Sequence, residues 1–560
     1  MKTLISLLFL TNFVVFLLKS EEINRDSSSR EEVLQLMESS ENLVAPKIKG
    51  LSLIGNLPSI EGKRRTFFNQ VEFVDLNVPG DESELAKRLS VLFLDQPLTQ
   101  DVIDQIKRDI VLYYREHEHP VVMVRVPEQE VTKGVLQIAV TEGVVGGIIV
   151  SGNRYTQSSQ LTRWISLKPG DSINEKRLLQ DLAWINSSPF RNVSVTYAPG
   201  EAYGSTEIWL NVEDRRPIRV YVGGDNTGSQ FTGRTRWFTG VNFANFFYPE
   251  NLLSYQFTMA NSAHLFQSHT GQFILPLPWR HIFNAFGAYA TVHPKLSGFT
   301  STGKSYQVSG RYDAPLWFTY PSVEQTLTLG FDYKGTNNNL IFGSDVEITE
   351  GSLVNIAQFV FGYHFGLQPR NQNIRGGIDI FWSPGQMISH QSNAEFATLN
   401  PNATAQYVYG RLAYSHEGKI YYNFSLFGDF QLQLSNSGLI PSEQLAIGGY
   451  NTVRGYPERV ANGDNGLYMN FEARSPHFSP FKKYMKDDLY FLAFADFGFA
   501  WDHSKIPGLP MTQTLIGVGP GLRYRIGSYF NMRADLGFPL HHVENWTGSP
   551  FIHLSAILSY

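Results

Sequence analysis

Long segments in the C-terminal part of this 560-residue chain alternate between apolar and polar side chains. In Val323–Tyr333, Gln325 is the only polar side chain in the apolar row, and Tyr422–Ser435 and Leu253–Ala260 repeat the pattern. Successive side chains of a β-strand point to opposite faces, so this period of two predicts strands with one apolar and one polar face. Segments of about ten residues or more have the length that a tilted strand needs to cross a bilayer.

A closed barrel fits these strands best. A soluble sandwich also alternates, but its strands are usually shorter. Residues 218–560, which follow Pro217, can hold about sixteen strands if each strand with its connection takes roughly 21 residues. The last segment, Phe551–Tyr560, alternates and ends in an aromatic residue, as outer-membrane barrels commonly do. Because only closure pairs every backbone group in lipid, we expect a transmembrane antiparallel β-barrel of about 16 strands.

The composition agrees with a chain that is rich in strands and turns. Aromatic residues make up 14% and charged residues 17%, and there are 48 glycines. The net charge of −5 leaves no cationic excess for a nucleic-acid backbone, so nucleic acid is not expected as a partner. The chain has no cysteine, which excludes disulfides, thiolate metal sites and cysteine nucleophiles.

The N-terminus has the pattern of an exported protein. Lys2 precedes an apolar run, Leu4–Leu18, which predicts a secretory signal peptide over residues 1–20. A membrane-anchoring helix is the alternative, but the run is short for the about 20 residues that a span needs. An N-terminal helix and a linker are expected over residues 21–64, with the amphipathic helix at Arg30–Ser40.

One order of elements, β-α-α-β-β, occurs twice before the barrel. It predicts two small α/β domains in series, at residues 65–143 and 144–217. The expected elements of the first domain are a strand at 67–76, helices at 82–93 and 99–115, and strands at 121–126 and 135–140. Those of the second domain are a strand at 147–150, helices from 157 and at 174–186, and strands at 193–197 and 207–212.

The strand at 121–126 of the first domain is a candidate site for strand addition by an extended polypeptide, and an edge that is blunted and merely structural is the alternative. The backbone of such a polypeptide can pair with an exposed sheet edge, while alternate side chains enter an adjacent apolar groove. The helix at 99–115 would line the groove, so the candidate residues are Val121, Met123, Val124, Ile106 and Ile110, with Val111 as a further neighbour. For each of the helix residues, a place in the core of the domain is the alternative.

A motif in the late part of the barrel carries a specific resemblance. Leu445–Glu458 reads LAIGGYNTVRGYPE and resembles the GG-x-x-TVRGY-x-E signature of the two-partner secretion transporters, the haemolysin-activator type of outer-membrane protein. Its core is similar to that of the wider superfamily of barrels with POTRA domains, and consists of Val453, Arg454, Gly455 and Tyr456. The F-x-D-x-G element of that superfamily is matched by Phe494, Asp496 and Gly498. Further matches extend the resemblance from about residue 65 to the C-terminus.

The resemblance implies a pore in the bacterial outer membrane, with two POTRA domains in the periplasm, through which one large exoprotein crosses unfolded. In this family the VRGY loop folds back into the barrel, which implies that Arg454 pairs with Asp496. Arginine offers a rigid bidentate fork to a carboxylate, and Gly455 would allow a tight reversal while Tyr456 packs the tip. A relative that assembles or inserts outer-membrane proteins is the alternative, because it would share the VRGY loop.

Two other motifs point to different chemistry but lack the context for it. Gly298–Ser305 satisfies G-x-x-x-x-G-K-S, yet the following residues predict a strand instead of the helix that a phosphate loop needs. Glu116–His119 has metal-binding residue types, but a hydrated surface turn is the better interpretation. We therefore expect no catalytic residue, metal site, cofactor or nucleotide. The expected partners are the secreted exoprotein and the lipid of the outer membrane.

Overall fold

The structure is a computed structural model that describes residues 46–55, 70–229, 232–293, 303–316, 323–337, 353–505, 510–543, 546 and 548–560. The signal peptide predicted at 1–20 and the helix predicted at 30–40 lie outside these residues. The chain forms two compact units, and the second unit contains the barrel together with Val150–Trp164 and Gln180–Ser194. Across the described ranges, no helix is long and apolar enough to cross a membrane.

The first domain has a four-stranded sheet in the order β2-β1-β4-β3. Its strands are β1 (Gly50–Ile54), β2 (Gln70–Val74), β3 (Val122–Arg125) and β4 (Val135–Glu142). The sequence predicts a linker up to residue 64, and this is wrong for residues 50–54, because β1 lies between β2 and β4 and runs parallel to both. All five residues of β1 are buried. A strand that is buried on both faces has no polar row, so the search for a period of two misses it.

Two helices cover this sheet and supply its core. The N-cap of α3 (Glu82–Phe93) is Asp81, whose carboxylate accepts a hydrogen bond from the Ser83 amide at 2.9 Å. The N-cap of α4 (Gln100–Glu116) is Thr99, which accepts from the Val102 amide at 3.3 Å. Such caps satisfy amide groups that have no partner in the first turn of a helix. The fully buried side chains of the core include Leu51, Leu85, Leu89, Ile106, Ile110, Tyr113, Tyr114 and Ile138.

The second domain repeats this order of elements. Its sheet has the strand order β5-β7-β6. The elements are β5 (Val144–Ser151), α5 (Ser158–Thr162), α6 (Glu175–Ile185), β6 (Arg191–Pro199) and β7 (Ser205–Asp214). In each domain, the first strand after the two helices is therefore an edge strand of the sheet. This strand is β3 in the first domain and β6 in the second.

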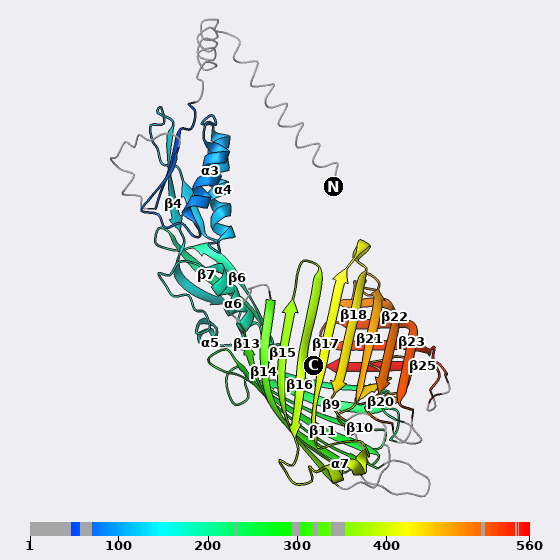
Figure 1. The fold of residues 1–560 in the computed structure, drawn as a ribbon. Helices are drawn as coiled ribbons and strands as arrows, with labels where there is room; N and C mark the ends of the chain where they lie inside the picture. The colour runs from blue at the N-terminus through cyan, green and yellow to red at the C-terminus, as the bar shows by residue number, and fades with distance from the viewer. Residues whose placement is uncertain are drawn as a thin grey trace, which may run out of the picture. The chain divides into compact units, whose positions relative to one another are not determined.

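Sixteen antiparallel strands form a closed barrel (Figure 1). The strands are β8 (Ile218–Asp225), β9 (Arg236–Ala244), β10 (Leu252–Ala260), β11 (Phe266–Pro276), β12 (Ile282–Val292), β13 (Gly303–Pro315), β14 (Val323–Thr336), β15 (Val354–Leu367), β16 (Gln372–Pro384), β17 (Gln406–Lys419), β18 (Ser425–Ser435), β21 (Asn465–Arg474), β22 (Asp487–Trp501), β23 (Thr512–Ile526), β24 (Phe530–Pro539) and β25 (Phe551–Ser559). The barrel closes where β25 pairs with β8. The predicted fold class is confirmed, and its strand number agrees with the structure.

The period of two is visible in the walls of the barrel. On β14, Leu327 and Leu329 are exposed on the outer face, whereas Asp332 lies buried on the inner face. One predicted strand begins too early, since β18 starts at Ser425 instead of Tyr422. Residues Tyr421–Asn423 form a 3₁₀ turn, η2, in which Tyr422 has a left-handed φ of 53°. The alternation of apolar and polar residues begins within this turn, so it does not show where β18 starts.

Apolar side chains also gather inside the barrel. The connection between β16 and β17 contains α7 (Asn393–Leu399), which a capping box of Ser392 and Glu395 begins. Phe396 of this helix packs with Tyr407 and Tyr409, two buried side chains of β17. Their strand neighbour Val408 is exposed, so the two tyrosines belong to the inner row. An apolar cluster thus fills part of the lumen beside β15 and β17.

Candidate functional site

The connection from β18 to β21, residues 436–464, is the lumen loop of this barrel. It contains a short hairpin of β19 (Leu445–Ile447) and β20 (Ala461–Gly463). The tip of the loop, Val453–Tyr456, is the VRGY motif, and each of its four residues is buried. Asp496 belongs to the inner row of β22, because its neighbours Ala495 and Phe497 are exposed. The loop therefore folds back into the barrel and meets its inner wall.

Arg454 and Asp496 form a bidentate ion pair in the lumen. Arg454 Nε donates to Asp496 Oδ2 at 2.8 Å, and Nη2 donates to Oδ1 at 2.8 Å. The backbone amide of Arg454 adds a third hydrogen bond to Oδ2, at 3.0 Å. The two side chains are 2% and 0% exposed. This geometry is the fork-to-carboxylate arrangement that arginine is suited to.

Two further contacts of Arg454 were not anticipated from the sequence. Its Nη1 donates to Glu472 Oε1 on β21 at 2.7 Å, and its guanidinium lies 3.7 Å from the centre of the Phe494 ring. Burial by itself lowers the pKa of Arg454, but the hydrogen bonds to Asp496 and the charges of the nearby carboxylates outweigh it and raise the pKa above its ordinary value. The guanidinium is therefore charged. Glu472 gave no signal in the sequence, since a lone glutamate on an inner row looks the same whether it is paired or hydrated.

The rest of the tip fits against β23, β24 and β25. Gly455 has a φ of +96°, and a Cβ there would lie 3.1 Å from the carbonyl carbon of Gly537, so only glycine suits the position. The Gly455 amide donates to His553 Nε2 at 3.2 Å. The Tyr456 hydroxyl lies 2.6 Å from the carbonyl oxygen of His541 and 3.0 Å from that of Ile516. Backbone groups of β23 and of the segment that follows β24 thus hold the tyrosine.

The glycine of the F-x-D-x-G element makes room for the tip. A Cβ at Gly498 would lie 2.7 Å from Val453 Cγ2. The structure therefore brings together all seven residues of the two motifs: Val453, Arg454, Gly455, Tyr456, Phe494, Asp496 and Gly498. One side of this site is a packed apolar cluster, and the other is a cluster of buried charges.

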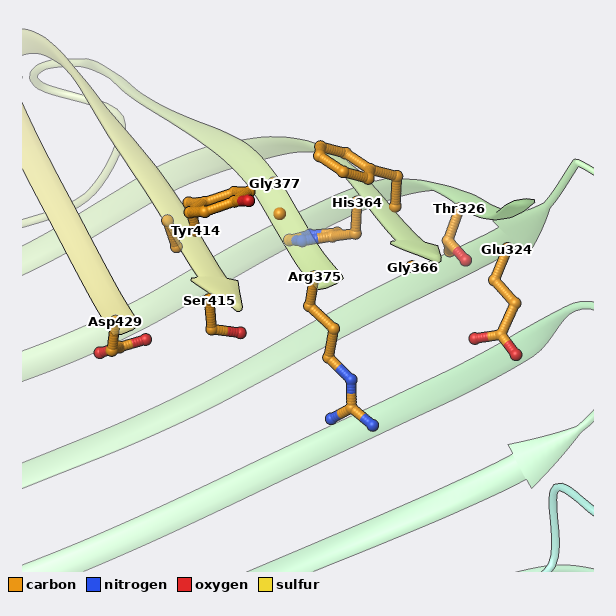
Figure 2. A pocket seen from close by; sticks show the side chains of 12 residues that line it. Glu324, Thr326, His364, Gly366, Arg375, Gly377, Tyr414, Ser415 and Asp429 are labelled. Carbon is orange, nitrogen blue, oxygen red and sulfur yellow. The ribbon is translucent and has the colours of Figure 1, made fainter. Parts of the chain in front are cut away.

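A second feature of the lumen is a hollow of about 340 Å³ beside strands β14 to β18. Figure 2 shows Glu324, Arg375 and Asp429 among its lining side chains. Gly377 makes room for the His364 ring, because a Cβ at Gly377 would lie 2.4 Å from His364 Nδ1. The wall of this hollow therefore carries charges of both signs.

The candidate groove of the first domain exists, and two of the residues predicted for it, Val111 and Val124, line it, whereas two others do not. Ile106 and Ile110 are 0% exposed and belong to the domain core, so their assignment to a binding site is wrong. A hollow of about 360 Å³ lies instead between α4 and β3, lined by Lys107, Arg108, Val111, Leu112, Arg115 and Val124. Ile106 and Ile110 are four residues apart and share the face of α4 that is turned to the sheet, whereas the residues of α4 that line the hollow lie on another face. The groove is therefore apolar with a basic rim.

The register of β3 shows which backbone groups face its free edge. The Gly143 amide donates to the Val121 carbonyl at 2.9 Å, and Met123 pairs with Thr141. Alternate residues of an antiparallel pair exchange both hydrogen bonds, so Val121 and Met123 bond to β4. Val122 and Val124 then direct their amide and carbonyl groups away from β4. The Met123 side chain is 43% exposed.

The other two motifs take ordinary structural roles where they are described. Gly303–Ser305, the end of the phosphate-loop pattern, begins strand β13, so a strand and not a helix follows that glycine; residues 298–302 lie outside the described part of the chain. His117 Nδ1 lies 2.8 Å from the Tyr113 carbonyl, and His119 contacts Glu142 at 3.3 Å. In the ranges that the structure covers, no group of three or more His, Asp or Glu residues is placed to hold a metal ion.

Comparison with known proteins identifies the family. The profile described as "Haemolysin secretion/activation protein ShlB/FhaC/HecB" matches residues 204–524, and a POTRA profile, "Surface antigen variable number repeat", matches residues 144–220. The outer membrane transporter CdiB-2 of Burkholderia pseudomallei is 21% identical over 483 residues, which is 81% of this chain and 77% of the relative.

Two solved structures place the fold. CdiB from Escherichia coli has a TM-score of 0.70 at 17% identity, covering 93% of this chain and 92% of that one. BamA from Haemophilus ducreyi, solved without POTRA domains 1–3, has a TM-score of 0.50 at 13% identity, covering 86% and 97%. The likeness to BamA is thus weaker than the likeness to CdiB. The barrel lies in the outer membrane with the POTRA domains in the periplasm, and the chain belongs to the haemolysin secretion/activation (ShlB/FhaC/HecB) family of two-partner secretion transporters.

Proposed function

We propose that this chain is the outer-membrane pore for one large partner exoprotein, which it recognises in the periplasm and passes outward in an unfolded form. The observation that carries the proposal is the VRGY tip, held by a buried ion pair inside a closed barrel of sixteen strands. Barrels of this size enclose an aqueous channel. Because the lumen loop lies in that channel, passage of a polypeptide requires the loop to move.

The lumen wall supports transport of an extended chain. Its inner rows carry charges of both signs, among them Glu324, Arg375 and Asp429. An unfolded polypeptide has unpaired amide and carbonyl groups, which need water or polar partners throughout the passage. The outer rows of the same strands are apolar and suit contact with the lipid of the outer membrane. No step of this function needs a catalytic residue, a metal, a nucleotide or another cofactor.

The groove between α4 and β3 is the proposed recognition site for the exoprotein in the periplasm. An extended segment of the exoprotein would pair with the outward amide and carbonyl groups of Val122 and Val124 and place alternate side chains against Val111 and Leu112. Three basic side chains, Lys107, Arg108 and Arg115, line the groove. The segment should therefore combine apolar with acidic residues.

The test uses the full transporter and the N-terminal segment of its partner exoprotein. Val124→Pro removes an amide that faces the free edge, and proline is tolerated at such a position. We expect affinity to fall about tenfold, as for the loss of one hydrogen bond of roughly 1.4 kcal/mol. Val124→Ala keeps the amide and is the matched control. Met123→Pro is uninformative, because it breaks the ladder to β4.

Co-expression gives the second test of the proposed function. Cells that produce the transporter with its partner exoprotein should release the exoprotein into the medium, whereas cells that lack the transporter should retain it in the periplasm. Equal release with and without the transporter rejects the proposed function. If Val124→Pro leaves binding unchanged while the first domain stays folded, strand addition at β3 is wrong, although the pore function stands.

A further inference from the structure

The lumen loop is held at a second place, 11 residues before Arg454 in the sequence. The Glu443 side chain is 1% exposed, and its carboxylate accepts hydrogen bonds from Lys334 Nζ at 2.9 and 3.1 Å. The same carboxylate accepts from Gln358 Nε2 at 3.1 Å and from the Tyr409 hydroxyl at 2.8 Å. These donors lie on β14, β15 and β17. A buried glutamate with three donors on three strands is an attachment point between loop and wall.

The groups around Glu443 are themselves fixed. Gln358 Nε2 also donates to Asp332 Oδ2 at 3.0 Å, and Asp332 is paired with Arg311 at 2.6 Å. The Tyr407 hydroxyl donates to Gln358 Oε1 at 2.9 Å. A polar network whose members all have partners holds its geometry, so the wall presents a preformed site to the Glu443 carboxylate.

Apolar packing reinforces the attachment. Leu439 and Ile440, which precede Glu443 in the loop, are both 0% exposed and pack with Phe396 of α7 and with the inner tyrosines of β17. The loop backbone is also bound to the wall, since the Glu443 carbonyl accepts a hydrogen bond from Gln433 Nε2 of β18 at 3.0 Å. The base of the lumen loop is thus bound to the wall by both polar and apolar contacts.

The two attachments lie on different arcs of the barrel. The tip contacts β21 to β25, whereas the Glu443 carboxylate contacts β14, β15 and β17. In the strand order, β18 separates the two arcs. We propose that Glu443 is a second anchor of the lumen loop, a positioning residue that keeps the base of the loop on the β14–β17 wall after the Arg454 tip is released.

This inference rests on the proposed function, in which the loop must move during transport. A tip that detaches while the base stays bound remains close to its own site, so its effective concentration there is high and it docks again once the channel is empty. A loop held at Arg454 alone would be free to leave the lumen at each opening. The second anchor thus makes release of the tip a local and reversible movement.

The absence of cysteine from the chain makes the test direct. Ser437→Cys reports on the base, and Thr452→Cys reports on the tip; both hydroxyls are buried and, among the described residues, have no hydrogen-bond partner to lose. Each reporter is placed in the full-length protein in liposomes and labelled with a hydrophilic maleimide. We expect Glu443→Gln to speed labelling of the base reporter at least tenfold and that of the tip reporter less than twofold.

Three comparisons make the result specific. Arg454→Ala should speed labelling of the tip reporter and leave the base reporter within twofold. Lys334→Met should behave like Glu443→Gln, whereas Lys334→Arg should restore slow labelling because it keeps the charge. Asp379→Asn is the matched control, since Asp379 pairs with His364 at 3.1 Å between two wall strands. Heat-modifiable migration in gels confirms that each variant has a folded barrel.

Two outcomes would overturn the second anchor. In the first, Glu443→Gln leaves the base reporter as slow as in the unchanged protein. In the second, either variant exposes both reporters equally, which means that the loop detaches as one body. Labelling needs no exoprotein, so these outcomes are separate from the proposed function. Normal labelling in a protein that secretes nothing would reject the pore function and leave the anchor in place.

Discussion

Replacing Arg454 by alanine would remove the most deeply buried cation of the cluster at the loop tip. Asp496, with a side-chain exposure of 0%, would then lose its guanidinium partner, whereas Glu472 would still pair with Arg474 at 2.7 Å. Breaking a buried ion pair by removing one partner costs roughly 3–5 kcal/mol. At about 1.4 kcal/mol for each factor of ten, the docked tip should become roughly a hundred-fold to several thousand-fold less favoured.

Arg454→Lys separates charge from shape. Lysine keeps one positive charge but loses the second hydrogen bond to Asp496 and the flat contact with Phe494. We expect it to loosen the tip less than alanine does, yet measurably. Arg525→Ala is the surface control, because Arg525 is 62% exposed and its pair with Asp488 should contribute at most about 1 kcal/mol.

The assay combines loop accessibility with secretion. Maleimide labelling of the Thr452→Cys reporter measures the docked tip, release of the exoprotein measures function, and heat-modifiable migration measures the barrel. Arg454→Ala should speed labelling, impair secretion and leave migration unchanged, because the ladder from β8 to β25 does not include the loop. Unchanged labelling and full secretion at normal expression would refute the assignment of Arg454 as the tip anchor.

Three further predictions concern other parts of the unit that contains the barrel. Burial raises the pKa of Glu458, in the lumen loop, to about 7, whereas an exposed glutamate titrates near about 4.3. Docking of the tip should therefore weaken as the pH rises from about 4 to about 7, and Glu458→Gln should abolish this loss; an equal response in that variant over the same pH window would contradict the assignment. Gly498→Val should expose the tip reporter, because its side chain overlaps Val453, at a cost of roughly 1–3 kcal/mol; slow labelling in a folded variant would show that the wall can yield. Arg280→Ala should make the segment at 180–194 more sensitive to limited proteolysis, because Asp181, 1% exposed, loses its ion pair; an unchanged cleavage pattern would assign that segment's order to other contacts.

Periodicity predicted the barrel well and the domain edges less well. The inner and outer rows of β14 differ in polarity over the whole strand, so the pattern survives single exceptions such as Gln325. β1 was missed because both of its faces are buried. Ile106 and Ile110 were misplaced because a sequence shows that a helix residue is apolar but not which of two surfaces it contacts.

Of the buried ionic contacts, some could be expected from the sequence and others could not. The pair of Arg454 with Asp496 was expected only through the resemblance of two motifs, and spacing alone does not join residues on a loop and a distant strand. Glu472 and Glu443 carried no local signal, since their partners come from strands far away in the sequence. Burial of a charge is a property of the folded lumen, and a single sequence does not display it.

The seam between β25 and β8 has a consequence for how this protein comes to fold. The two strands meet through five residue pairs, and across the seam Arg219 donates to the Ser559 hydroxyl, 340 residues away in the sequence. Contacts between such distant segments form late, because a long stretch of chain must be ordered before they are made. Until then β8 and β25 are both open edges, so the unclosed chain depends on protection from aggregation in the periplasm.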